Sequence, residues 1–250
     1  MPRTRTATLK GFADLHLRPP IDNLKQVETL VRRSAQLGYN LVGVSLPPNT
    51  EQNDIAKLRA ICAKAGIDLA TRVDLNPKTT SDLLRNLRAL RRKFELISVM
   101  CTSKPIARQA AKDRRVDLLS FATDPRERFF DNAEATLASS ASASLEIDMA
   151  PLLWLNSVPR TRLLSRLRRE VETAKKFGVP VVVSSGTEDP YLLRSPHDYA
   201  ALTVLFDLPS PLRMRALSEN PLAIVNRNRS KLSPDYVAPG IRIVKRGKDC

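Results

Sequence analysis

Two groups of residues have types and spacings that could do chemistry. Asp14 and His16 are separated by one residue in an apolar segment, so on a strand their side chains would point the same way. A carboxylate and an imidazole on one face could ligate a divalent cation. Ser185 and Arg194 follow an apolar run, and Ser195 is typical of a helix N-cap. A polar turn, an arginine and a helix N-terminus could together hold an anion.

Both groups also have simpler interpretations. The segment around Ser195 would equally suit an ordinary loop and helix cap, with Pro196 as the first helical residue and Asp198 completing a capping box. Only two histidines occur, His16 and His197, which disfavours a catalytic metal site built on imidazoles. Further polar or reactive residues lie at the carboxyl ends of the predicted strands, and they are Ser45, Arg72, Asp74, Cys101, Thr102, Asp124, Glu146, Asp148, Ser184 and Asn226.

Apolar runs of strand length alternate with helical patterns along the chain, which favours a closed (β/α)8 barrel of the TIM type, with an open doubly wound sheet as the alternative. The predicted strands are Ala7–Leu15, Leu41–Leu46, Ile67–Val73, Leu96–Met100, Val116–Phe121, Ser144–Met149, Val181–Val183 and Leu222–Val225. The predicted helices are Leu24–Leu37, Asp54–Ala65, Thr80–Arg92, Pro105–Lys112, Asn132–Ser140, Arg160–Phe177, Pro196–Leu205 and Pro211–Ser218.

The spacing of these elements predicts one α/β barrel domain over residues 1–230. Gly38 and Gly66 fall where two helices should end, as glycines after a helix C-terminus do. No linker-like stretch divides the chain. Residues 231–250 carry several arginines and lysines, and we expect them to form a basic C-terminal tail.

The charge of the chain points to a polyanionic partner. It has 41 Lys and Arg residues against 26 Asp and Glu, a formal net charge of +15. Such an excess is typical of proteins that bind nucleic acid or anionic surfaces. Three widely spaced cysteines without a CxxC pair, and N-terminal residues without an apolar signal segment, indicate a cytoplasmic protein. No apolar run is long enough to span a bilayer, so we expect no membrane partner.

Basic side chains recur at helical spacing on three predicted outer helices, which suits contact with phosphates rather than base reading. Aromatic residues make up only 5% of the chain, so base stacking is not the expected mode. With Arg194 and Ser185, the predicted RNA- or phosphate-binding residues are Arg85, Arg88, Arg92, Lys104, Arg108, Arg162, Arg166 and Arg169.

Four segments of the chain resemble the protein component 3 family of archaeal and eukaryotic ribonuclease P. They are FADLHLRPP at 12–20, LEIDMAPLL at 145–153, VVVSSGTEDPYLLRSPHDYAALTVLFDLP at 181–209 and ALSENPLAIVNRN at 216–228. The resemblance implies a barrel related to the metal-dependent PHP phosphoesterases. It also implies a subunit of the endoribonuclease that removes 5′ leaders from precursor tRNA, in which the RNA subunit performs hydrolysis with bound Mg²⁺.

The resemblance further implies the partners: ribonuclease P RNA, protein component 2 and the other protein subunits, and precursor tRNA through the complex. It implies no catalytic residue and no cofactor in this chain. PHP enzymes begin with His-x-His, whereas this chain has Asp14-x-His16, so these two residues are at most vestigial metal ligands. Two alternatives remain: a free-standing PHP-like metal-dependent phosphoesterase, and a barrel enzyme for a small phosphorylated metabolite that binds at the seventh strand.

Overall fold

A parallel seven-stranded sheet forms the centre of the molecule. The computed structural model describes residues 11–238 and 241–243. The strands follow one another in the order β1-β2-β3-β4-β5-β6-β7, and each pairs in parallel with the next. They are β1 Phe12–Leu17, β2 Tyr39–Ser45, β3 Asp68–Leu75, β4 Leu96–Met100, β5 Leu118–Ser120, β6 Ser144–Asp148 and β7 Val181–Ser184.

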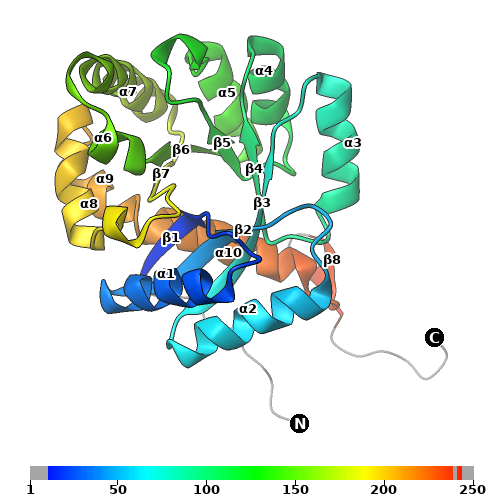
Figure 1. The fold of residues 1–250 in the computed structure, drawn as a ribbon. Helices are drawn as coiled ribbons and strands as arrows, with labels where there is room; N and C mark the ends of the chain where they lie inside the picture. Colours follow the sequence, from blue (N-terminus) through cyan, green and yellow to red (C-terminus); the bar gives the residue numbers. More distant parts are fainter. Residues whose placement is uncertain (1–10, 239–240, 244–250) are drawn as a thin grey trace.

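Helices alternate with the strands and cover the outside of the sheet (Figure 1). The α-helices are α1 Leu24–Gln36, α2 Gln52–Lys64, α3 Thr80–Leu90, α4 Lys104–Lys112, α5 Asn132–Ala141, α6 Ala150–Trp154, α7 Ser157–Phe177, α8 Pro196–Leu202, α9 Ser210–Arg215 and α10 Glu219–Leu232. Three short 3₁₀ helices are η1 Pro125–Glu127, η2 Pro190–Leu192 and η3 Thr203–Phe206.

Local sequence explains where the helices begin and end. Helix α3 begins after Thr79, whose hydroxyl accepts a hydrogen bond from the Asp82 amide, as an N-cap does. Its buried stripe is Leu83, Leu87 and Leu90, as the spacing predicts. After α1 the backbone reaches φ +95° at Gly38, a left-handed conformation that favours glycine. The predicted helix termini there and after α2 are confirmed.

The sheet closes on itself at the carboxyl ends of β1 and β7. Leu17 forms a bridge with Thr187, and the Gly186 amide donates to the His16 carbonyl at 3.0 Å. Nearer the amino ends, the backbone of Ala216 and Leu217 lies between the two strands. Their carbonyls accept hydrogen bonds from the amides of Val183 and Ala13. The TIM-like barrel is therefore confirmed, and this short irregular segment stands in the place of an eighth strand.

The predicted strand Leu222–Val225 is wrong, because these residues lie in α10. Leu222, Ile224 and Val225 pack against one apolar cluster inside the barrel. These three side chains fill the part of the barrel interior that side chains of an eighth strand would fill, but they come from a helix. The other members of the cluster come from six strands and are Ala13, Leu15, Leu41, Ala70, Leu96, Leu118 and Val182.

Helix α10 also binds the amino ends of the strands through polar side chains. Arg229 contacts both oxygens of Asp68, at 2.5 and 3.2 Å, and Glu95 at 3.0 Å. Asn228 donates to Asp117 and to the Glu95 carbonyl, each at 2.8 Å. The helix is thus fixed across the amino end of the barrel by both packing and ion pairs.

Two expectations concern the chain ends. Residues 7–10 of the first predicted strand lie outside the described residues, as does much of the predicted basic tail over 231–250. The described part of that tail ends α10 and continues as a two-stranded antiparallel hairpin, β8 Tyr236–Ala238 with β9 Ile241–Arg242. Among the described residues, no helix is both long and apolar enough to cross a bilayer.

Candidate functional site

A buried ion-pair network centred on Arg72 occupies the carboxyl ends of the strands. The guanidinium, which is fully buried, grips both oxygens of Glu146 at 2.6 and 2.7 Å. It also donates to Asp74 at 2.8 Å and to the Leu15 carbonyl at 2.9 Å. The hydroxyl of Ser184 donates to Glu146 at 2.9 Å. The predicted positions of these polar residues at strand ends are confirmed, and the guanidinium compensates the charge of the carboxylates.

His16 joins this network through both ring nitrogens. Its Nδ1 lies 2.8 Å from Asp148 and its Nε2 lies 3.4 Å from Asp74. Burial and the neighbouring Arg72 lower the pKa of His16, but the two carboxylates more than offset them and raise it to about 10. The imidazole is therefore protonated at neutral pH and acts as the second cation of the network.

Two carboxylates of the network, those of Asp74 and Asp148, have lowered pKa values. Burial raises the pKa of Asp74, but Arg72 and then His16 oppose it and hold that pKa well below its usual range. The pKa of Asp148 is also lowered, mainly by His16 against the effect of burial. General acid–base catalysis needs a group that titrates near the working pH, and these side chains titrate far from it. The arrangement suits structural stabilisation rather than proton transfer.

Asp14 does not share the surroundings of the His16 side chain. The pairing of β1 with β2 is irregular between Asp14 and Leu17, so the alternation assumed from the sequence fails there. Asp14 Oδ1 instead accepts the amides of Ser185 and His16, at 2.9 and 3.1 Å. Burial raises the pKa of Asp14. The two side chains therefore do not lie on one face, as their spacing on a regular strand would place them.

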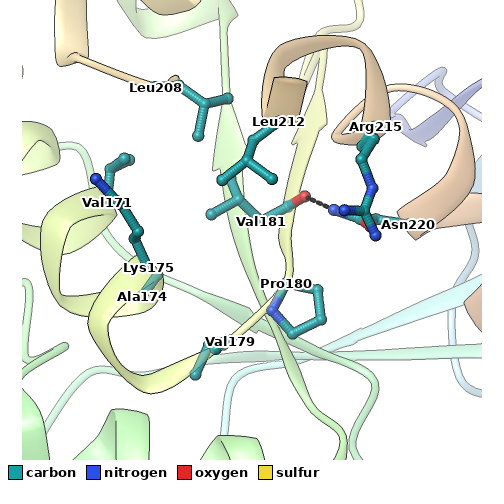
Figure 2. Close-up of a pocket in the computed structure, with 11 residues that line it drawn as sticks. Val171, Ala174, Lys175, Val179, Pro180, Val181, Leu208, Leu212, Arg215 and Asn220 are labelled. Atoms are coloured by element: carbon teal, nitrogen blue, oxygen red, sulfur yellow. Dashed lines mark hydrogen bonds between the residues drawn. The ribbon is translucent and has the colours of Figure 1, made fainter. Parts of the chain in front are cut away.

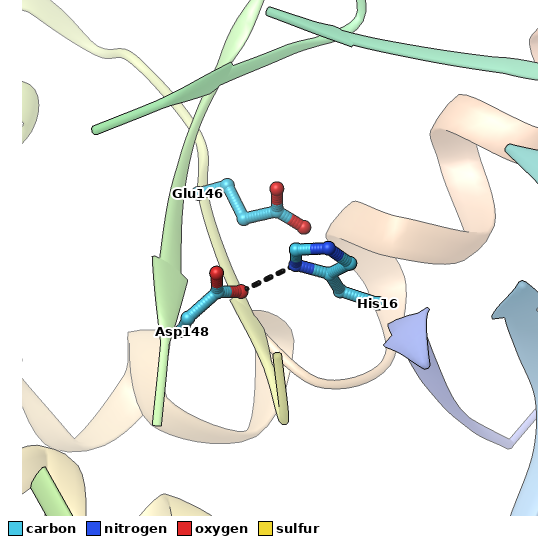
Figure 3. A group of neighbouring side chains, drawn as sticks. All are labelled: His16, Glu146 and Asp148. Atoms are coloured by element: carbon cyan, nitrogen blue, oxygen red, sulfur yellow. Dashed lines mark hydrogen bonds and ion pairs between the residues drawn. The ribbon is translucent and has the colours of Figure 1, made fainter. Parts of the chain in front are cut away.

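The side chains that could surround a metal ion are instead His16, Glu146 and Asp148 (Figure 3). One donor atom from each lies within 4.8 Å of the others. Both Glu146 oxygens already accept the Arg72 guanidinium, and this buried positive charge beside the cluster disfavours a second cation there. These residues do not fit a divalent cation, and the geometry gives no support to a free-standing metal-dependent phosphoesterase.

The turn after β7 is built as the sequence predicts, but its donors point inward. Ser185 is fully buried, its amide bound to Asp14 and its hydroxyl donating to the His16 carbonyl at 3.2 Å. The half-buried Arg194 donates to the carbonyls of Tyr191 and Leu193. Ser195 and Asp198 form the predicted capping box at the start of α8. A phosphate contact for Ser185 or Arg194 therefore stays a prediction, for RNA and for a small metabolite alike.

Most of the predicted phosphate-binding residues lie on the molecular surface. Arg88 and Arg92 of the α3 region and Arg162 and Arg169 of α7 are exposed. Three others are exposed and paired with acids: Arg85 with Asp82, Lys104 with Asp131 at 3.1 Å, and Arg108 with Glu134 at 3.3 Å. Contact with RNA stays a prediction for all seven.

Arg166 differs from these residues. It is half-buried, donates to the Arg128 carbonyl at 2.5 Å and lies 3.1 Å from Glu170. Glu170 is fully buried and also receives Arg128 at 2.6 Å. The helical spacing predicts that Arg166 faces outward, and this prediction is wrong. Arg166 instead belongs to a buried ion-pair cluster with Glu170 and Arg128. Glu170 lies three residues after the buried Leu167, so the helical spacing did carry a signal of its burial.

A mostly apolar cavity of about 270 Å³ lies between α7 and α9 beside the start of β7 (Figure 2). Val171 and Ala174 of α7 line one side, and Leu208 and Leu212 line the other. Asn220 closes an edge by donating to the Val181 carbonyl at 2.8 Å. The lining offers no cluster of reactive side chains.

Comparison with known proteins gives consistent matches. A family model described as RNase P subunit p30 matches residues 11–233. Ribonuclease P protein component 3 of Methanosarcina mazei is 27% identical over 238 residues, covering 95% of this chain and 97% of that protein. Its counterpart in Methanothermobacter thermautotrophicus is 27% identical, covering 94% and 96%. A chain in a cryo-EM structure of archaeal ribonuclease P with mature tRNA has the same fold, with a TM-score of 0.80 at 22% identity, covering 94% of this chain and 99% of that chain.

Proposed function

The chain belongs to the RNase P subunit p30 family, which makes it a protein subunit of ribonuclease P, and we propose that it binds and stabilises the catalytic RNA there. The holoenzyme is the tRNA-processing endoribonuclease. In this proposal the RNA carries out the hydrolysis with bound Mg²⁺. This chain contributes no catalytic residue and no cofactor.

The observation that carries the proposal is the net charge of +15 together with exposed arginines on outer helices. Guanidinium groups form charge-assisted hydrogen bonds with phosphate oxygens. Each phosphate that they neutralise releases counterions. The folded RNA is stabilised most, because its phosphates lie close together and repel one another. The internally paired network at the strand ends supports a structural role for that part of the barrel.

We further propose that the loops at the carboxyl ends of the strands dock a protein partner, component 2 or another subunit. Trp154, Val158 and Tyr191 are exposed there, by 53%, 56% and 87% of their surfaces. Exposed large apolar side chains at one end of a barrel are typical of protein interfaces. A reducing cytoplasmic setting belongs to the same proposal, supported by the buried free thiols of Cys62 and Cys101.

The decisive experiment is reconstitution of ribonuclease P from its RNA and proteins with and without this chain. Precursor-tRNA cleavage is measured at low Mg²⁺, where RNA folding depends most on proteins. We expect omission to slow cleavage strongly and the RNA affinity to fall steeply with salt. Unchanged cleavage on omission, or RNA binding that is independent of salt, would overturn the proposal.

The docking surface is tested by pull-down of component 2. Trp154→Ser with Tyr191→Ser should weaken capture, while Val204→Ser, at an apolar position on η3 that is 47% exposed, should not. Equal capture by both variants would reject the carboxyl-end loops as the interface.

A further inference from the structure

The amino end of the barrel, opposite the Arg72 network, carries a basic pocket of about 620 Å³. Its wall comes from the residues after α3, the loop before β5, the end of α10 and strand β8. We call it the amino-end pocket, and its charged lining residues are Arg91, Arg92, Arg114, Arg115 and Lys231.

Two of these arginines build the pocket rather than being available to a ligand. Arg91 contacts Asp117 at 2.5 Å and donates to the carbonyls of Phe94 and Glu95, each at 2.8 Å. Arg115 grips both oxygens of Asp113 at 2.9 and 2.6 Å. These bonds fix the wall and neutralise the charges of the residues involved.

The other three cations have no such compensation. Arg92, Arg114 and Lys231 are exposed, and none forms an ion pair with any residue in the described part of the chain. Partial burial and the neighbouring Arg227 lower the pKa of Lys231, although Asp117 opposes them. The pocket is therefore a place where positive charge exceeds the acids around it.

We infer that the amino-end pocket binds the phosphate backbone of the ribonuclease P RNA through Arg92, Arg114 and Lys231. The inference rests on the proposed function and names the surface that performs it. Three cations from three separate elements surround one concavity, which suits successive phosphates of a folded strand better than a single small anion. The hydrogen bonds of Arg91 and Arg115 fix the backbone that carries the neighbouring Arg92 and Arg114, so these cations lie around one concavity before the RNA binds.

The test is a triple variant, Arg92→Gln, Arg114→Gln and Lys231→Gln, in the full chain. A matched control replaces three exposed lysines elsewhere, Lys25, Lys64 and Lys78, by glutamine, so that both proteins lose the same net charge. RNA affinity is measured across a salt series. Three lost phosphate contacts should reduce the slope of log K against log salt by about 2–3 and weaken binding by at least tenfold at low salt. The slope measured for the control should differ from that of the wild-type chain by less than about 1.

Equal slopes for the two variants would overturn the inference. A second readout, backbone footprinting of the RNA in the reconstituted complex, should show phosphates that are protected by the wild-type chain and the control but exposed with the triple variant. Loss of binding to phosphatidylserine vesicles with unchanged RNA affinity would assign the pocket to a membrane and overturn the inference. If the wild-type chain supports cleavage and the triple variant binds RNA normally, the pocket inference fails alone. If omission of the chain has no effect, the proposed function fails.

Discussion

Replacement of Arg72 by methionine is the most direct test of the network at the strand ends. The guanidinium binds both oxygens of Glu146, the nearer oxygen of Asp74 and the Leu15 carbonyl, all within 2.9 Å. Methionine fills a similar volume without charge or donors. The variant would therefore leave three carboxylates, Glu146, Asp74 and Asp148, with only His16 to compensate them.

The expected loss of stability is large because Arg72 and Glu146 are both fully buried. Removing one member of a buried ion pair costs about 3–5 kcal/mol, since the other charge is left unpaired. The two further contacts, with Asp74 and with the Leu15 carbonyl, place the loss for Arg72→Met near the upper end of that range, at about 4–5 kcal/mol. A domain typically has about 5–15 kcal/mol in total, so the variant would fold only marginally. Arg72→Lys keeps the charge but loses the planar fork, and should cost about 1–3 kcal/mol.

The measurement is urea unfolding at pH 7, followed by far-UV circular dichroism. Arg88→Met on the exposed face of α3 is the matched control and should change stability by less than about 0.5 kcal/mol. A double-mutant cycle with Glu146→Gln should give a coupling of about 2–3 kcal/mol. If Arg72→Met lost less than about 1 kcal/mol, or the coupling were near zero, the network would not be what stabilises this end of the barrel.

Three further predictions follow from other contacts. Because the folded-state pKa of His16 is raised to about 10, its contribution to stability is full below about pH 6.5 and is lost as the pH rises toward 10. The midpoint temperature of thermal unfolding should therefore fall over that pH range, and His16→Asn should make the fall smaller. Glu170→Gln should cost about 3 kcal/mol in urea unfolding, because Arg128 stays buried beside it, and a loss no larger than that of Arg88→Met would contradict the role of the pair. Ser142 has φ +64° at the end of α5, so Ser142→Gly should stabilise by roughly 0.5–1 kcal/mol, and a destabilisation would show that its side chain contributes more than its backbone strain costs.

Much of the fold was predictable because its signals are local. Helical spacing identified the buried stripe of α3, and three consecutive valines identified β7. One exception was the end of the predicted helix Pro211–Ser218, because α9 ends at Arg215. The other was Leu222–Val225, whose apolar composition suits a strand and a buried helix equally. What decides between them is the Ala216–Leu217 segment, which already occupies the gap between β7 and β1. That occupancy depends on tertiary contacts and leaves no mark in the local pattern.

The site was predictable in position but not in pairing. Polar residues at strand ends could be read from the sequence, yet the bond between Arg72 and Glu146 joins residues 74 positions apart. The pairing of Asp14 with His16 failed because one irregularity in the β1 ladder changes which way a side chain points. Helical periodicity likewise placed Arg166 on a charged outer face. It could not predict that the Arg166 side chain donates to the carbonyl of Arg128, which lies in a loop.

Helix α10 connects the stability of the barrel to its charged amino end. Its first half supplies apolar side chains to the barrel interior, and its second half carries Arg227, Asn228 and Lys231. Arg227 and Asn228 both bind Asp117, the same carboxylate that fixes Arg91 in the wall of the amino-end pocket. A strand in this position would have left the amino end without these side chains. Because Leu222–Val225 lie in a helix rather than in the predicted strand, α10 both packs against the core and builds the basic surface. In an ordinary barrel enzyme the carboxyl end carries the chemistry. Here the Arg72 network at that end pairs its own charges, whereas Arg92, Arg114 and Lys231 at the other end form no ion pair within the described part of the chain.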